Sequence, residues 1–69
     1  MTPSFSQPNQ SVLAGIECLQ WLASSHHPIS NIEMARRMNV DRNRANRLLK
    51  SLVMAGMAQQ TPDRKFIVG

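Results

Sequence analysis

Two helix signals stand only two residues apart in the middle of the chain, and this spacing constrains the fold more than any other feature. Asn39 suits the left-handed conformation that ends a helix, and Asp41 is a good N-cap for the next one. Helices predicted over residues 31–38 and 42–55 must therefore be joined by a turn of three or four residues. A turn of this length is typical of a helix-turn-helix.

An earlier helix is predicted from about Asn9 or Ser11 to Ser24, where apolar residues recur at the helical period. The predicted buried stripe consists of Val12, Leu13, Ile16, Leu19, Leu22 and Ala23. Trp21 lies away from this stripe on a helical wheel, near Cys18, and indicates a second apolar patch. That patch could pack under a C-terminal hairpin or against another subunit.

Local signals also bound the helix over residues 31–38. Pro28 disfavours helical backbone in the residue before it, so the first helix must have ended by then. Ser30 and Glu33 fit a capping box, in which each side chain accepts a hydrogen bond from the other residue's amide. We expect this helix to bury Ile32, Ala35 and Met38.

Two short segments that close the chain predict a β-hairpin. They cover residues 57–60 and 65–68, and the residues between them, Thr61 to Arg64, have turn chemistry. Ile29 is expected to add a short strand at the edge. The result is a mainly α fold with a small β-hairpin: a winged helix-turn-helix of three helices plus a wing over residues 9–69. Residues 1–8, rich in Ser, Pro and Gln, are expected to form a flexible arm.

Charge is divided unevenly along the chain. Residues 1–35 contain no Lys or Arg and two acids, whereas residues 36–69 contain all eight basic residues and two acids. The formal charges of the two parts are therefore −2 and +6, which sum to the +4 of the whole chain. A pI near 10.8 with the positive charge gathered in one part is typical of a protein that binds a polyanion.

The helix over residues 42–55 carries side chains that can recognise base pairs. On a helical wheel one arc is apolar and predicted to face inward, with Ala45, Leu48, Leu49, Leu52 and Val53. The opposite arc and its shoulders hold Asn43, Arg44, Asn46, Arg47, Lys50 and Ser51. Arg and Lys can donate hydrogen bonds to guanine, Asn can pair with adenine, and an α-helix fits the major groove. An ordinary solvated face would mix charges of both signs. We therefore predict double-stranded DNA as the partner.

Further contacts are predicted on the DNA backbone. Arg42 begins this helix, and Arg64 and Lys65 stand at the predicted wing tip, although an ordinary solvated turn would also carry such residues. Ser30, with Asn31 beside it, begins the preceding helix, where amides can bind a phosphate. Arg37 ends that helix and is a further phosphate candidate, but a cation there also has a purely structural role near the negative end of the helix dipole.

The sequence does not favour an enzyme. No nucleophile, base and orienting acid fall together, no Cys and His spacing predicts a metal site, and no cofactor is expected. Cys18 is expected to be a partly buried hydrophobic residue, and His26 and His27 to lie in a solvated loop. No transmembrane stretch or secretory signal is visible, so a cytoplasmic protein is expected.

Two other binding functions compete with DNA recognition. Winged helices also serve as docking modules, which here would contact a protein partner through the first helix. RNA binding is disfavoured, because the chain has no Tyr and no pair of aromatic residues placed for base stacking.

Four segments together resemble the N-terminal DNA-binding domain of IclR-type transcription regulators. They are residues 11–23, 29–35, 46–52 and 66–69, and the strongest part is the run Arg47-Leu48-Leu49 with Leu52, followed by Gly56. The resemblance implies a winged helix-turn-helix that forms a homodimer partly through its first helix and binds an operator. It also implies a larger effector-binding domain after the wing, which this chain would lack, and a backbone contact for Arg47.

The chain departs from the family pattern where the recognition helix begins. That helix often starts with Pro and a Ser-Thr pair, where this chain has Asp41, Asn43 and Arg44. The operator sequence therefore cannot be carried over from the family.

Overall fold

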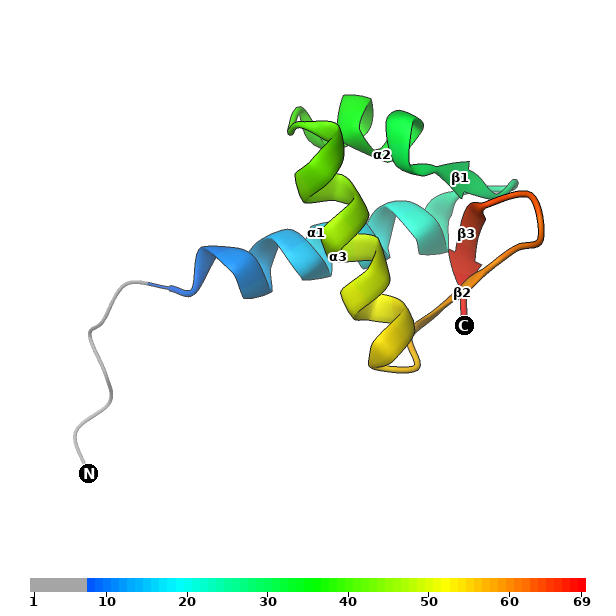
Figure 1. The fold of residues 1–69 in the computed structure, drawn as a ribbon. Coiled ribbons are helices and arrows are strands. Elements are labelled where there is room, and N and C mark those ends of the chain that lie inside the picture. The colour runs from blue at the N-terminus through cyan, green and yellow to red at the C-terminus, as the bar shows by residue number, and fades with distance from the viewer. Residues whose placement is uncertain (1–7) are drawn as a thin grey trace.

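The computed structural model describes residues 8–69, so the predicted arm at residues 1–8 lies outside the described residues except for Pro8. The elements follow in the order α1 Gln10–Ser24, β1 Ile29–Ser30, α2 Asn31–Met38, α3 Arg42–Met54, β2 Ala58–Gln60 and β3 Lys65–Val68. Figure 1 shows the helices crossing one another, with the small sheet at one end of α1. This arrangement confirms the predicted winged helix-turn-helix.

The turn between α2 and α3 forms as its sequence predicts. Asn39 adopts left-handed backbone, with φ 56° and ψ 48°. The carboxylate of Asp41 accepts a hydrogen bond from the amide of Arg44 at 2.6 Å, which caps α3. Val40 between them packs against the core. A cap of this kind contributes about 1 kcal/mol, so the turn fixes the residue at which α3 begins.

The predicted capping box of α2 is only half correct. The Ser30 hydroxyl accepts a hydrogen bond from the Glu33 amide at 3.1 Å. The Glu33 carboxylate, however, accepts a hydrogen bond from Arg37 at 2.7 Å and lies 3.4 Å from Nε2 of His27. A charged donor forms a stronger hydrogen bond to a carboxylate than a neutral amide does, and Arg37 is one turn away on the same face.

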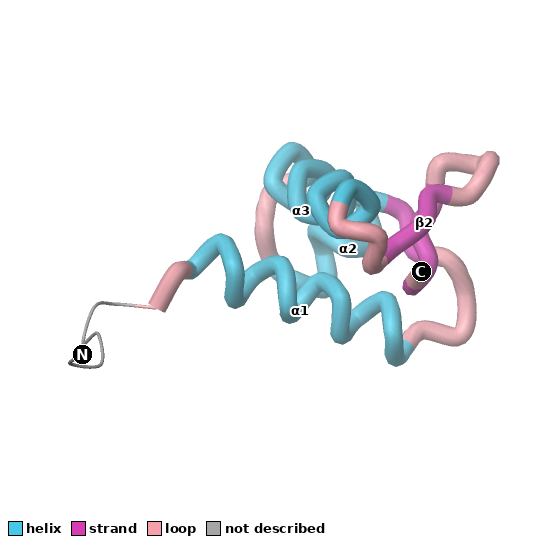
Figure 2. The backbone as a smooth tube through the Cα atoms, turned by 90° about the horizontal axis from the view of Figure 1, so that it is seen from below, coloured by secondary structure: helices cyan, strands magenta, loops and turns pink. Residues whose placement is uncertain are grey.

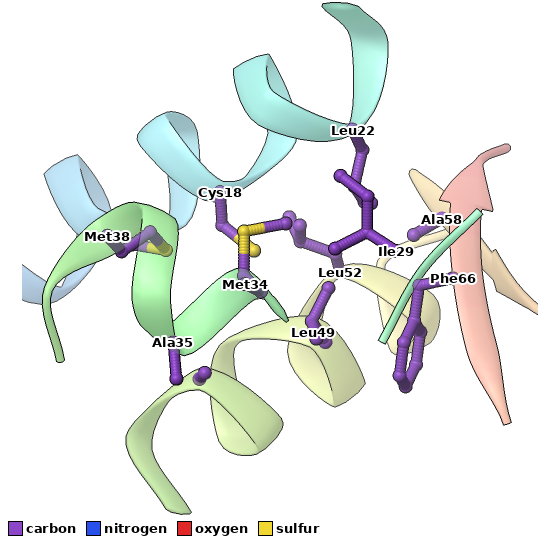
Figure 3. Close-up of a cluster of buried hydrophobic side chains, with 11 residues drawn as sticks. Cys18, Leu22, Ile29, Met34, Ala35, Met38, Leu49, Leu52, Ala58 and Phe66 are labelled. Atoms are coloured by element: carbon purple, nitrogen blue, oxygen red, sulfur yellow. The ribbon is translucent and has the colours of Figure 1, made fainter. Parts of the chain in front are cut away.

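Side chains from all three helices and from the sheet meet in one hydrophobic core, which Figure 3 shows. The largest fully buried side chains are Phe66, Ile29, Met34, Leu49 and Cys18. Helix α3 also buries Ala45 and Leu52, while Leu48 and Val53 are partly buried. The predicted inner arc of α3 is therefore confirmed.

The buried stripe of α1 differs from the prediction. Cys18 and Leu22 are the buried residues, whereas Val12, Leu13 and Ile16 are 56%, 49% and 49% exposed. The first turns of α1 extend beyond the other elements in both Figure 1 and Figure 2, and the described residues 8–69 leave about half of each of these three side chains uncovered. Periodicity identified a helix with an apolar face, but not which part of it the core covers.

The buried face of α2 also needs a correction. Met34 is fully buried, while Ile32, which was expected in the core, is 45% exposed. Ala35 and Met38 are buried as expected. Ile32 lies three residues before Ala35 and Met34 lies four residues before Met38, so each has helical spacing to one of the two and the pattern alone could not separate them.

The sheet has the order β1-β3-β2 and is antiparallel throughout. Ile29 in β1 pairs with Phe66 in β3, which confirms the short edge strand, and Gln60 in β2 pairs with Phe66 from the other side. The chain enters the wing through Gly56, whose φ of 78° favours glycine. Strand β2 begins one residue later than predicted.

The wing tip holds Arg64 in left-handed backbone, with φ 65°. Thr61 closes this loop: its amide donates to the Lys65 carbonyl at 2.8 Å, and its hydroxyl accepts from the Lys65 amide at 3.0 Å. The same hydroxyl contacts the carboxylate of Asp63. A residue with a β carbon is disfavoured in this backbone region relative to glycine by roughly 1 kcal/mol.

We therefore expect Arg64→Gly to raise the free energy of unfolding by about 0.5–1 kcal/mol, because glycine adopts left-handed backbone without steric strain. The greater conformational entropy of glycine in the unfolded chain reduces this stabilisation and is included in the value. Urea denaturation followed by circular dichroism measures the change. As a control, Lys65→Gly in strand β3 should destabilise the fold. An Arg64→Gly variant less stable than the parent would contradict the assignment of strain to this turn.

Candidate nucleic-acid interface

Helix α3 turns its polar arc to solvent because its apolar arc is held in the core. Asn43, Arg47 and Lys50 are exposed along the centre of the outer face. Asn46 and Arg44 are half-buried on its two sides. Met54, 89% exposed at the end of the helix, continues the same line and was not among the predicted site residues.

A groove of about 370 Å³ lies between α3 and the wing, and we call it the helix-wing groove. It is lined by Asn31, Asn46, Lys50, Gln60, Arg64 and Phe66. Nζ of Lys50 donates a hydrogen bond to Oε1 of Gln60 at 3.3 Å, which connects the helix to the wing. The groove brings Arg64 of the predicted wing beside Asn46 and Lys50 of the predicted helix over residues 42–55.

A second hollow of about 250 Å³ lies on the opposite side of α3, towards the start of α1. Its lining residues are Ser11, Arg44, Arg47, Leu48 and Ser51. The Ser51 hydroxyl donates to the backbone carbonyl of Arg47 at 2.8 Å, so Ser51 is occupied within its own helix. Arg44 and Arg47 therefore border a different hollow from Asn46 and Lys50.

Arg37 is held against α1, in contacts that do not involve the polar arc of α3. Its guanidinium donates to Glu33 at 2.7 Å and lies 5.4 Å from the ring centroid of Trp21. Nε1 of Trp21 in turn donates to Glu17 at 3.3 Å. Trp21 therefore packs beside α2. His26 and His27 are both exposed, as expected of a solvated loop, and Nε2 of His27 lies 3.4 Å from the Glu33 carboxylate.

The charge of Glu33 is stabilised within this cluster. Desolvation by burial raises the pKa of Glu33, but hydrogen bonds from Arg37 and His27 and their positive charges outweigh it, so the pKa lies below its ordinary value. The carboxylate is thus committed to partners on α2 and the preceding loop. It does not neutralise the cations of α3.

The remaining predicted contacts lie at the ends of elements. Arg42 is exposed at the first residue of α3. The Ser30 hydroxyl is half-buried and already caps α2. Nζ of Lys65 lies 3.9 Å from the carboxylate of Asp63, a weak exposed pair on the wing.

Acidic side chains lie away from the two hollows of α3, since neither lining contains one. Glu17 and Glu33 belong to the contact between α1 and α2, Asp41 caps α3, and Asp63 faces Thr61 and Lys65. The face of α3 with its two hollows therefore presents cations, amides and hydroxyls and no carboxylate in either lining. Such a face attracts a polyanion.

The thiol of Cys18 is buried in the core. Burial raises the pKa of the Cys18 thiol to about 11, and Glu17 adds to this shift, so the thiol is protonated and unreactive at neutral pH. No group of three or more His, Cys, Asp and Glu side chains in this range could hold a metal ion. Within the same range, no helix has both the length and the apolar character needed to span a membrane.

Comparison with solved structures finds the same fold in transcription regulators. An IclR family regulator from Brucella abortus is 21% identical with a TM-score of 0.82, over 90% of this chain and 24% of that chain. A regulator from Alicyclobacillus acidocaldarius is 24% identical with a TM-score of 0.81, over 91% of this chain and 26% of that one. These identities establish the fold alone.

The fold also occurs outside regulators. A chain described as a pericyclic reaction enzyme is 30% identical with a TM-score of 0.72, over 87% of this chain and 16% of that one. The chain thus spans between 16% and 26% of the length of these three structures. Among curated proteins, none matches it.

A family model decides the assignment. The model of the IclR helix-turn-helix domain matches residues 11–62, from the first turn of α1 to the tip of the wing. This range includes the capped turn, the buried arc of α3 and the polar arc opposite to it. The chain therefore belongs to the IclR helix-turn-helix domain family.

Proposed function

We propose that this domain binds double-stranded DNA sequence-specifically as the reading head of a transcription regulator, with α3 in the major groove. The observation that carries the proposal is the exposed row of Asn43, Arg47 and Lys50 on a helix whose opposite face is buried. Asn can pair with the edge of adenine, Arg and Lys can donate to guanine or to a backbone phosphate, and the helix has the width of the groove. Membership of the IclR helix-turn-helix family supports the same function.

The contacts divide between bases and backbone. Asn43, Asn46 and Lys50 lie in or beside the groove with Arg44 and Arg47, and Arg42 contacts a phosphate at the start of α3. Arg64 and Lys65 place the wing on the flanking backbone or minor groove. Ser30 and Arg37 are weaker candidates, because Ser30 caps α2 and Arg37 would have to leave Glu33 and Trp21 to reach a phosphate.

We also propose that two copies pair through α1 when the domain binds a palindromic operator. The expected region was that of Trp21, but Trp21 is partly buried beside Arg37. Val12, Leu13 and Ile16 form the exposed apolar face of this helix instead. Two heads spaced by about one helical turn would each read a half-site.

Docking of a different protein onto α1 is the second candidate function. The exposed apolar residues of α1 favour it. A chain described as an enzyme contains the same fold, and one fold can host several functions. It predicts a contact insensitive to salt and no retardation of DNA fragments. We propose no catalytic activity for the domain itself, and we propose a cytoplasmic location, in line with the expectation from the sequence.

Selection of bound fragments from a random duplex pool is the experiment that tests DNA recognition. With a selected duplex, Arg47→Ala should weaken binding to this and to unrelated sequences alike, and should lower the salt slope by about one, because one phosphate contact is lost. Arg47→Lys keeps the charge and should keep the slope. An isotherm unchanged by Arg47→Ala would remove this residue from the interface.

Asn43→Ala should relax the base preference at one position and leave the salt slope unchanged, because an amide reads a base edge and neutralises no phosphate. A repeated selection with the variant measures the preference. The same consensus from both proteins would exclude Asn43 from base recognition.

Ile16→Glu should weaken binding to a duplex with two half-sites by about tenfold or more, because a carboxylate would lie in an apolar contact between the copies. Binding to a single half-site should be unchanged. Gln20→Glu adds the same charge at another exposed position of α1 and serves as the control. Equal effects of the two variants would argue against pairing through Ile16.

A further inference from the structure

Cations from two different elements line the helix-wing groove. Lys50 comes from α3 and Arg64 from the loop between β2 and β3. The other polar lining residues are Asn31, Asn46 and Gln60, whose side chains are amides. Phe66, which is 1% exposed, is the apolar lining residue. An anion in this groove would therefore meet donors from α2, α3 and the wing.

Neither cation is neutralised by a neighbouring carboxylate. The ion pairs formed within residues 8–69 involve His27, Arg37 and Lys65, and none involves Lys50 or Arg64. Lys50 donates to the neutral amide of Gln60, which positions Nζ beside the wing without reducing its charge. The groove thus keeps two positive charges at a concave surface, where the field on an anion is strongest.

The backbone of Arg64 argues that its side chain has a function. Glycine would fit the left-handed residue of this turn without a steric penalty, yet the chain has an arginine there at φ 65°. Residues held in disfavoured backbone regions gather at functional sites. Arg64 is also one of the residues that line the groove, so a function for its side chain is available at that place.

We propose that the helix-wing groove binds one phosphate of the DNA backbone, with Lys50 and Arg64 acting together on that single group. This inference rests on the proposed DNA binding and deepens it. Organic ligands favour mostly apolar pockets, whereas this lining offers two cations and three amides to a small anion. Lys50 then positions the helix on the backbone, and the wing engages only when α3 is seated at the right depth.

The test maps each cation to its phosphate. Duplexes based on a sequence selected by the domain carry one uncharged methylphosphonate at a time, and the affinity of the 69-residue chain is measured for each. Lys50→Ala and Arg64→Gly should both lose sensitivity to substitution at the same phosphate. Arg64→Gly is preferred to alanine here, because glycine fits the backbone of the turn and unfolding cannot explain a loss of binding.

Salt dependence gives a second readout on a mixed-sequence duplex of about 20 base pairs. Each single variant leaves one cation on the shared phosphate, so the slope should fall by less than one, and the double variant should lower it by about one in total. Two separate phosphates would give a fall of about two. A fall of that size in the double variant would overturn the shared site.

Lys65→Ala is the matched control, because it removes a wing charge next to Arg64 in sequence but outside the groove lining. Its effect should map to a phosphate other than that of Lys50, and the two changes in slope should add. If the unmodified chain binds no duplex in a salt-dependent way, the proposed function fails. If it binds, but Lys50 and Arg64 map to different phosphates, only the shared site is overturned.

Discussion

Burial of one face of α3 is the constraint on which the rest of the structure depends. Leu49 and Ala45 are fully buried and Leu52 nearly so, among side chains from α1, α2 and the sheet. Rotating α3 about its axis would expose them, at a cost of roughly 2 kcal/mol for each leucine. Because side chains on a helix are separated by about 100°, the same packing fixes the direction of Asn43, Arg47 and Lys50. Core stability and the orientation of the polar arc are therefore one physical requirement.

The acidic and basic residues that lie in different parts of the sequence also lie in different parts of the folded domain. Residues up to 35 contribute Glu17 and Glu33, and both carboxylates are used between α1, α2 and the loop that joins them. The basic residues that follow lie mainly on α3 and the wing, which share the helix-wing groove. Arg36 and Arg37 are the exceptions, since both lie in the last turn of α2, and Arg37 is held by Glu33 and Trp21. The acidic side chains of α1 and α2 thus contact groups within the domain, whereas Lys50 and Arg64 in the helix-wing groove have no carboxylate neighbour.

Local signals predicted the elements well, and long-range packing explains what they missed. Asn39, Asp41 and Gly56 act on backbone within a few residues, so their roles could be read from the sequence alone. The buried faces of α1 and α2 depend on which neighbours reach them, and Val12 and Ile32 were therefore misplaced. The contact of Gln60 with Lys50 depends on how the hairpin docks against α3, which a pattern of residue types does not encode.

The residues of the wing tip and of the helix-wing groove say more about function than the fold does. The fold is shared with regulators and with a chain described as an enzyme, so its core cannot distinguish the two. A winged helix that served only as a packing module would gain nothing from an arginine in a left-handed turn, or from a lysine and an arginine, Lys50 and Arg64, that no carboxylate neutralises. Each of these features opposes folding slightly in the isolated domain. A polyanion bound between α3 and the wing offsets both costs at once, because it satisfies the same two side chains, Lys50 and Arg64.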